Sequence, residues 1–174
     1  MQIVPAGPED FDALRALHRQ TMFAHVDRAV GWDEEQQLRR LRKHFNPECL
    51  RFVLMHGRRI GCYSLEDRGD DFLLSQFYIA PSHQGRGLGS MVLIRILRMA
   101  EWAKKPVRLS VLKGSPALRL YERFGFLHER DDPYQHHCVW KPAGRIDGHG
   151  RGRVSPASSY PDGDEAGHAG VQPC

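Results

Sequence analysis

At the centre of the sequence stands the stretch Gln84-Gly85-Arg86-Gly87-Leu88-Gly89-Ser90. The preceding residues 72–79 are rich in aromatic and aliphatic side chains and are followed by Ala80-Pro81, which is typical of a largely buried strand that ends at a proline. The residues after it repeat apolar side chains at helical spacing: Leu88, Val92, Ile96, Met99 and Ala103. The sequence therefore predicts a strand, a glycine turn and the start of a helix.

The glycine turn suits a phosphate group. Its glycines allow positive φ and remove the Cβ atoms that would keep a ligand away from the backbone. The first N–H groups of the helix lack an acceptor within it, and the helix dipole favours an anion at that end. Arg86 can add a guanidinium to the same anion. The G-x-G-x-G spacing differs from the G-x-G-x-x-G dinucleotide fingerprint, and no Gly-Lys-Ser/Thr follows, so a nucleotide P-loop is excluded as well. A tight connection that binds nothing is the alternative interpretation.

The turn resembles the Gln/Arg-x-x-Gly-x-Gly/Ala signature of the GNAT superfamily of acyl-CoA N-acyltransferases. Gln84, Gly87 and Gly89 occupy the signature positions. Residues 77–81 resemble the end of that family's central strand, and residues 120–126, Leu-Tyr-Glu-Arg-Phe-Gly-Phe, resemble its second signature. The two signatures in this order make the resemblance specific.

The resemblance implies an acyltransferase that passes an acetyl group from acetyl-CoA, its acyl donor substrate, directly to a primary amine. In the family, the backbone at the end of the central strand pairs with the pantetheine arm, and the glycine turn holds the phosphates. The implied cofactor-binding residues are Phe77, Tyr78, Ile79, Gln84, Gly85, Arg86, Gly87, Leu88, Gly89, Ser90, Ser115 and Tyr121. At position 115 relatives often have an asparagine that contacts the cofactor arm, whereas a serine there can also cap a helix.

Two catalytic roles follow from the resemblance. Tyr121 stands where similar proteins carry the tyrosine that protonates the departing thiolate, and its unperturbed pKa near 10 suits that role. A core aromatic is the alternative interpretation. Many relatives carry a general base on the central strand, but Ser75 and Gln76 stand there and cannot take a proton at neutral pH. Glu34 or Glu35 from the segment between the first two helices, with Glu35 as the catalytic candidate, or a chain of waters, would then remove the proton.

The order of predicted elements is β-α-α-β-β-β-α-β-α-β-β. This pattern predicts an α/β (α+β) fold, a GNAT-like mixed and mostly antiparallel central sheet with helices on both faces. The resemblance covers residues 1–141, which we expect to form the acetyltransferase domain. Residues 142–174 are rich in Gly and Pro and poor in large apolar side chains, so they are predicted to form a disordered tail.

Composition and charge argue against nucleic-acid binding, membrane association and metal binding. The formal net charge is +4, and no basic run is interleaved with aromatics, so nucleic-acid binding is not predicted. No apolar run is long enough to cross a membrane and no signal peptide is recognisable, so we expect a cytoplasmic protein without a membrane partner. The scattered cysteines predict free thiols. No metal is predicted, because alternation along a strand leaves only His136 and Cys138 together in His136-His137-Cys138.

The sequence leaves several points open. The acceptor can be a small-molecule or peptide amine, the acyl group can be acetyl or longer, and a homodimer is compatible with the sequence. A non-catalytic acyl-CoA-binding module, acting as a sensor or regulatory subunit, is the rival function, because the central strand lacks the usual carboxylate. In the family, the segment between the first two helices closes over the acceptor, so residues 32–35 are the first place to look for specificity.

Overall fold

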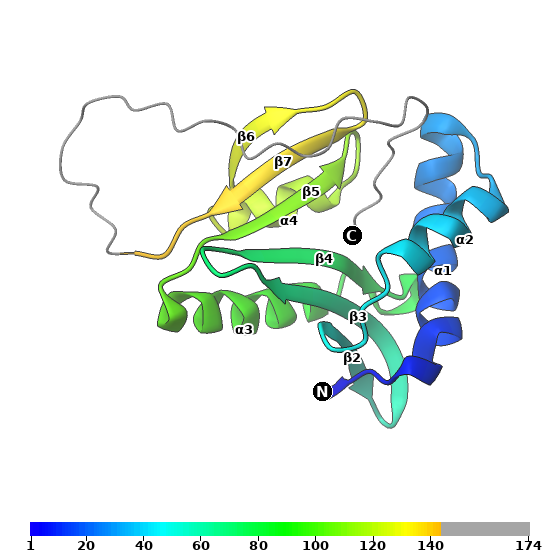
Figure 1. Ribbon diagram of the computed structural model, residues 1–174, viewed down its shortest axis with the longest axis horizontal. Helices are drawn as coiled ribbons and strands as arrows, with labels where there is room; N and C mark the ends of the chain where they lie inside the picture. The colour runs from blue at the N-terminus through cyan, green and yellow to red at the C-terminus, as the bar shows by residue number, and fades with distance from the viewer. Residues whose placement is uncertain (144–174) are drawn as a thin grey trace.

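The computed structural model describes residues 1–143 of the chain (Figure 1). The observed order is the predicted β-α-α-β-β-β-α-β-α-β-β, with a short 3-10 turn before α1 and another before α3. The elements are β1 (Gln2–Pro5), α1 (Phe11–Val30), α2 (Glu34–Lys43), β2 (Leu50–Met55), β3 (Arg58–Asp67), β4 (Phe72–Ile79), α3 (Leu88–Ala103), β5 (Val107–Leu112), α4 (Ala117–Arg123), β6 (Leu127–Asp131) and β7 (Gln135–Trp140). The predicted disorder of the tail concerns residues that lie, apart from positions 142 and 143, outside the described part.

The strands form one seven-stranded sheet in the order β1-β2-β3-β4-β5-β7-β6. Every neighbouring pair is antiparallel except β4 and β5, which run parallel. The predicted mixed, mostly antiparallel sheet is therefore confirmed.

The parallel pair is short. Its register consists of two residue pairs, Phe72 with Val107 and Leu73 with Arg108. Beyond them β4 and β5 diverge, while β5 continues along β7 and β4 along β3 (Figure 1). The sheet is thus open in the middle, at the carboxyl ends of its two central strands.

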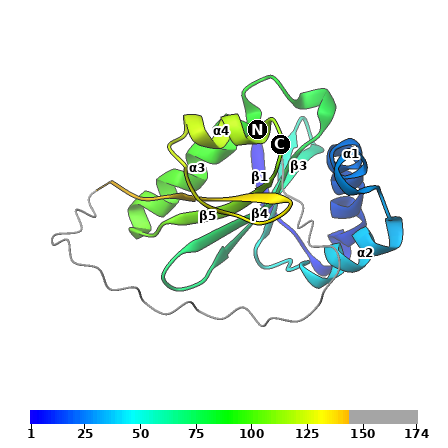
Figure 2. The same ribbon diagram turned by 90° about the horizontal axis from the view of Figure 1, so that it is seen from above.

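Helices cover both faces of the sheet, as predicted (Figure 2). On one face α3 and α4 bury a cluster that includes Leu93, Leu97 and Tyr121. On the other face α1 and α2 bury a second cluster that includes Leu14 and Leu41. Because apolar side chains are buried from water on both faces of the sheet, the packing of helices on each face stabilises the central strands. Among the helices of residues 1–143, none combines the length and apolarity that a membrane crossing needs.

Local signals in the sequence explain where the elements begin and end. The Asp33 carboxylate accepts the backbone N–H of Gln36 at 2.9 Å and so caps α2. The hairpin between β2 and β3 turns at His56 and Gly57, both with positive φ. Gly125 adopts a φ of 85° one residue beyond the C-cap of α4 and so ends that helix in the left-handed conformation.

A β-bulge bends β4 near its end. Cys62 pairs with Tyr78 and Ser64 with Ser75, so two steps along β3 face three along β4. The extra residue is accommodated at Gln76, whose φ is 52° although it is not a glycine. The bulge sends the side chains of Phe77 and Ile79 into the α3–α4 cluster, and that of Tyr78 into the α1–α2 cluster.

Candidate active site

The glycine turn lies between the end of β4 and the start of α3. Gly85 and Gly87 have φ values of 72° and 77°, and a Cβ built at either position would meet no atom within 4 Å. Glycine is therefore favoured at these two positions by the positive φ and not by a lack of space around the Cβ position. Gly87 precedes the first helical residue without a side-chain cap, so the first N–H groups of α3 are available to a ligand as the sequence predicts.

Gly89 serves a different purpose from the two glycines before it. A Cβ built there would meet Leu120 at 3.6 Å, Phe77 at 3.9 Å and Ile79 at 4.0 Å, all ordinary contact distances. An alanine would therefore fit, in keeping with the Gly/Ala alternative of the family signature. These contacts also show that the start of α3 packs between the end of β4 and α4, so the two signature segments meet in space.

Polar groups tie this turn to its surroundings. The Gln84 side chain donates to the carbonyl of Ile79 at 2.7 Å and so fixes the turn to the end of β4. Arg123, at the end of α4, donates to the Ser90 hydroxyl in the first turn of α3 at 3.3 Å. Arg86 is exposed at the turn itself. Two guanidinium groups therefore lie beside the end of α3 that is predicted to bind phosphates.

The edge of β4 is predicted to bind the pantetheine arm of the acyl donor. Phe77, Tyr78 and Ile79 lie beyond the last rung shared with β5, where the two strands have separated. Their side chains are buried on the two faces of the sheet, so what they present to the opening is backbone. An extended ligand can add to such an edge as an extra strand would.

Tyr121 lies on α4 with its side chain completely buried. Its ring packs edge-on against Phe126, with 5.5 Å between the ring centroids, and it shares the buried cluster with Phe77 and Leu88. The structure thus brings Tyr121 to the same cluster as the end of β4 and the start of α3. The predicted roles of Tyr121 as an acid and as a contact of the cofactor stay predictions.

Ser115 occupies the connection between β5 and α4. Its hydroxyl accepts the N–H of Ala117 at 3.3 Å, and its carbonyl accepts that of Leu118 at 3.3 Å. It therefore supports the first turn of α4, as the capping alternative holds. Ser115 is half-buried and follows the C-terminal end of β5, and its predicted contact with the cofactor stays a prediction.

The face of the sheet covered by α1 and α2 contains a chain of buried polar side chains. His18 on α1 lies 3.1 Å from the Tyr78 hydroxyl through Nδ1, and 3.2 Å from the Gln37 side-chain oxygen through Nε2. Burial lowers the pKa of His18 from 6.5 to about 4, although Gln37 and Glu34 both act to raise it. The imidazole is therefore neutral at physiological pH.

A shallow pocket opens above this chain between α1 and α2. The ring of Trp32 lies against His18, with 5.6 Å between centroids, and the indole N–H donates to Glu34 at 2.8 Å. Arg15 and Arg19 also bind Glu34, and together with the indole they lower the pKa of that carboxyl. The pocket is lined by Arg15, His18, Arg19, Trp32, Glu34, Gln37, Leu38 and Leu41.

Glu35 points away from this pocket. Its side chain is 79% exposed and pairs with Arg39 one turn further along α2. The structure therefore holds Glu34 at the pocket and Glu35 outside it, and it does not bring Glu35 to Tyr121. The proposed role of Glu35 as base stays a prediction, and it would require the side chain to leave Arg39.

The sequence alone did not indicate two residues of this region. Arg123 stands inside the second signature stretch, and the helical spacing from Leu120 could have suggested that it lies near the first. His18 gave no signal, because a single histidine within a helix carries no spacing pattern and its partner Tyr78 is 60 residues away.

Comparisons with known proteins agree with this geometry. Residues 47–127 match the family model of the acetyltransferase (GNAT) domain. No curated protein matches the chain. The predicted resemblance to the GNAT superfamily is confirmed over residues 47–127.

Solved structures with the same fold include three named acetyltransferases. The PaiA N-acetyltransferase from Thermoplasma acidophilum, in complex with coenzyme A, is 17% identical with a TM-score of 0.66, over 80% of this chain and 98% of that chain. An acetyltransferase from Thermus thermophilus is 22% identical with a TM-score of 0.62, over 80% and 96%. The ribosomal-protein-S18-alanine N-acetyltransferase from Escherichia coli is 17% identical with a TM-score of 0.58, over 79% and 90%. At these identities the likeness is one of fold.

Proposed function

We propose that this protein is an acetyl-CoA-dependent N-acetyltransferase that passes the acetyl group directly to a primary amine. The observation that carries the proposal is the opening between β4 and β5 with the glycine turn of α3 at its edge. A strand edge, an open glycine backbone and two arginines match the parts of an acyl-CoA: an extended arm that ends in phosphates. A coenzyme A complex of one protein with this fold supports the same donor.

The reaction needs positioning and two proton transfers. The amine nitrogen attacks the thioester carbonyl, the new C–N bond forms, and the C–S bond breaks to release the thiolate. Tyr121 would donate the proton that the thiolate takes up, and the ammonium-like nitrogen would lose its proton to Glu35 or to water. The peptide N–H groups at the start of α3 and the guanidinium of Arg86 would hold the phosphates during both steps.

The acceptor would enter from the α1–α2 side. This face carries the pocket with Trp32 and Glu34, which supports the assignment of residues 32–35 to acceptor specificity. A small-molecule or peptide amine fits the proposal equally well. The cytoplasmic location and a homodimer stay predictions from the sequence.

The test follows free thiol released from acetyl-CoA with pooled amines, amino acids, aminoglycosides and peptides. Wild type and Tyr121→Phe are compared, and binding of acetyl-CoA to both is measured by calorimetry. We expect turnover with one pool and a loss of roughly tenfold or more in kcat for Tyr121→Phe, with the affinity for acetyl-CoA retained. Equal turnover in the two proteins would make Tyr121 a core residue only.

A second candidate function is a non-catalytic acyl-CoA-binding module. It is favoured by the absence of a carboxylate at Ser75 and Gln76 and by the complete burial of Tyr121. Binding of acetyl-CoA without thiol release from any pool would support this second candidate over the enzyme.

A further inference from the structure

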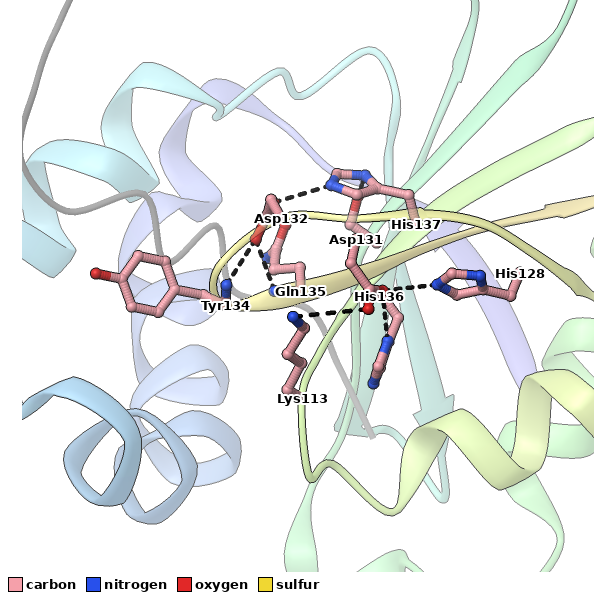
Figure 3. Close-up of polar contacts among 9 residues, drawn as sticks. Lys113, His128, Asp131, Asp132, Tyr134, Gln135, His136 and His137 are labelled. Carbon is pink, nitrogen blue, oxygen red and sulfur yellow. Dashed lines mark hydrogen bonds and ion pairs between the residues drawn. The ribbon is translucent and has the colours of Figure 1, made fainter.

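The β6–β7 hairpin carries a cluster of imidazole and carboxylate groups outside the residues assigned to the acyl-donor site (Figure 3). Its members are His128 and Asp131 on β6 and His136 on β7. One ligand atom from each, two imidazole nitrogens and one carboxylate oxygen, all lie within 4.8 Å of one another. These three residues are called the hairpin triad below.

The register of the hairpin explains how the triad assembles. Asp131 and His136 are direct cross-strand partners, so their side chains share a face. His128 precedes Asp131 by three residues, and strict alternation would put the two on opposite faces. A β-bulge between His128 and Arg130 inserts one residue and returns His128 to the face of Asp131. Without that irregularity the hairpin would offer two ligands instead of three.

The three side chains converge on one oxygen. His128 Nε2 lies 2.6 Å and His136 Nδ1 2.7 Å from Oδ1 of Asp131, and Figure 3 shows both rings turned toward it. A tetrahedral ion with bonds near 2.0–2.2 Å separates its ligand atoms by roughly 3.3 Å. Each imidazole nitrogen would therefore need to move less than about 1 Å away from Oδ1, and the two nitrogens, which lie within 4.8 Å of each other, would need to settle near the same separation. Exposed side chains on a hairpin can make such adjustments.

The surroundings of the triad suit an ion taken from solvent. The side chains of His128, Asp131 and His136 are 53%, 43% and 24% exposed, so an ion can arrive without opening the core and water can complete its coordination. Lys113 contacts the other carboxylate oxygen, Oδ2, at 3.7 Å and leaves Oδ1 directed at the two imidazoles (Figure 3). Its charge opposes a cation, so the affinity is expected to be moderate.

We propose that the hairpin triad binds a divalent first-row transition-metal ion such as Zn²⁺. Two imidazoles and one carboxylate are ligands that such ions prefer, whereas Mg²⁺ and Ca²⁺ select oxygen. The ion would cross-link β6, an edge strand whose residues are all exposed, to β7. No metal is predicted from His136, His137 and Cys138 alone. Cys138 is buried in the core, and the other two proposed ligands, His128 and Asp131, lie on β6.

The chain supplies a matched control for the triad. His137 follows His136 directly but faces the other side of the sheet, where it contacts Asp132 at 2.9 Å and the Ser110 hydroxyl at 2.8 Å. A change at His137 therefore removes a neighbouring imidazole without touching the triad.

The experiment titrates the full-length protein, freed of metal by dialysis against a chelator, with ZnCl₂ in a calorimeter. We expect one Zn²⁺ bound by the wild type and by His137→Gln, and an affinity lower by roughly tenfold or more in His128→Gln and in His136→Gln. The thermal midpoint of the wild type should rise with Zn²⁺, and those of the two ligand variants should not. Unchanged circular dichroism without metal verifies that every variant is folded.

Two outcomes would overturn the proposal. One is a wild-type protein that binds no Zn²⁺, and the other is binding that His128→Gln and His136→Gln leave unaltered. Co²⁺ spectroscopy provides an independent readout, because nitrogen and oxygen ligands give visible d–d bands without a thiolate charge-transfer band. A strong thiolate band would place the ion at a cysteine and would equally contradict the triad.

Discussion

His18 Nδ1 and the Tyr78 hydroxyl lie 3.1 Å apart, and this contact joins the middle of α1 to the end of the central strand β4. Tyr78 is 1% exposed and His18 5%, so the pair is closed off from water. The contact connects the helix pair α1–α2, on which the acceptor is predicted to bind, to the strand that would hold the acyl donor.

The first prediction concerns pH and this pair. The pKa of His18 is about 4 in the folded protein and 6.5 when exposed, so below pH 6.5 the unfolded chain takes up the proton first. The stability that neutral His18 contributes is present above pH 6.5 and is lost as the pH falls toward 4, by about 3 kcal/mol at most. Chemical denaturation at several pH values, with His18→Gln as reference, measures the loss. A wild-type curve parallel to that of the variant would contradict the prediction.

The second prediction separates the roles of two glycines in the turn. Gly87→Ala places a side chain at a φ of 77° and should cost about 1–2 kcal/mol of stability. It should also weaken acetyl-CoA binding, because relaxation of the strain would displace the first N–H groups of α3. Gly89→Ala meets only ordinary contacts and should leave both quantities within about twofold or 0.5 kcal/mol. Urea denaturation and calorimetry with acetyl-CoA measure both, and equal effects of the two changes would contradict the assignment.

The third prediction concerns Arg123, which contacts Ser90 at the start of α3. If Arg123 supplies charge to the phosphate site, Arg123→Gln should weaken acetyl-CoA binding by about fivefold at low salt, which corresponds to roughly 1 kcal/mol. The difference should shrink as the ionic strength rises. Arg98→Gln removes an equal charge from the exposed face of α3, well beyond its first turn, and serves as the control. Equal losses in the two variants would indicate a general charge effect.

The fourth prediction tests the base. If Glu35 accepts the proton from the amine, Glu35→Gln should lower kcat by roughly 100-fold. Glu34→Gln serves as the comparison, because it releases Arg15, Arg19 and the Trp32 indole and should act mainly on the KM of the acceptor. An unchanged kcat in Glu35→Gln would assign the proton transfer to water.

Much of the fold could be predicted because residues close in sequence determine where its helices and strands begin and end. Asp33 caps a helix, Gly125 ends one, and Ala80-Pro81 ends the central strand, and each of these acts over a few residues of sequence. The glycine turn was likewise visible, since positive φ at Gly85 and Gly87 is a local demand.

The features that could not be predicted from the sequence depend on irregular strand pairing or on contacts between distant residues. The β4 bulge is centred on Gln76, and glutamine is not a residue type that favours positive φ. The partnership of His18 with Tyr78 spans 60 residues, and the hairpin triad depends on a second bulge that breaks the alternation used to judge histidine positions. Burial of Tyr121 and the outward direction of Glu35 are likewise outcomes of packing, which periodicity alone does not fix.

The two-rung pairing of β4 with β5 also bears on how the protein avoids self-association. A divided sheet has two additional edges, and an exposed strand edge is a template on which other chains can aggregate. Here the diverging ends of β4 and β5 lie within one sheet, with helices on both of its faces. A thin, extended ligand would thus be able to pair with these edges, whereas the edge of another sheet would meet the flanking helices.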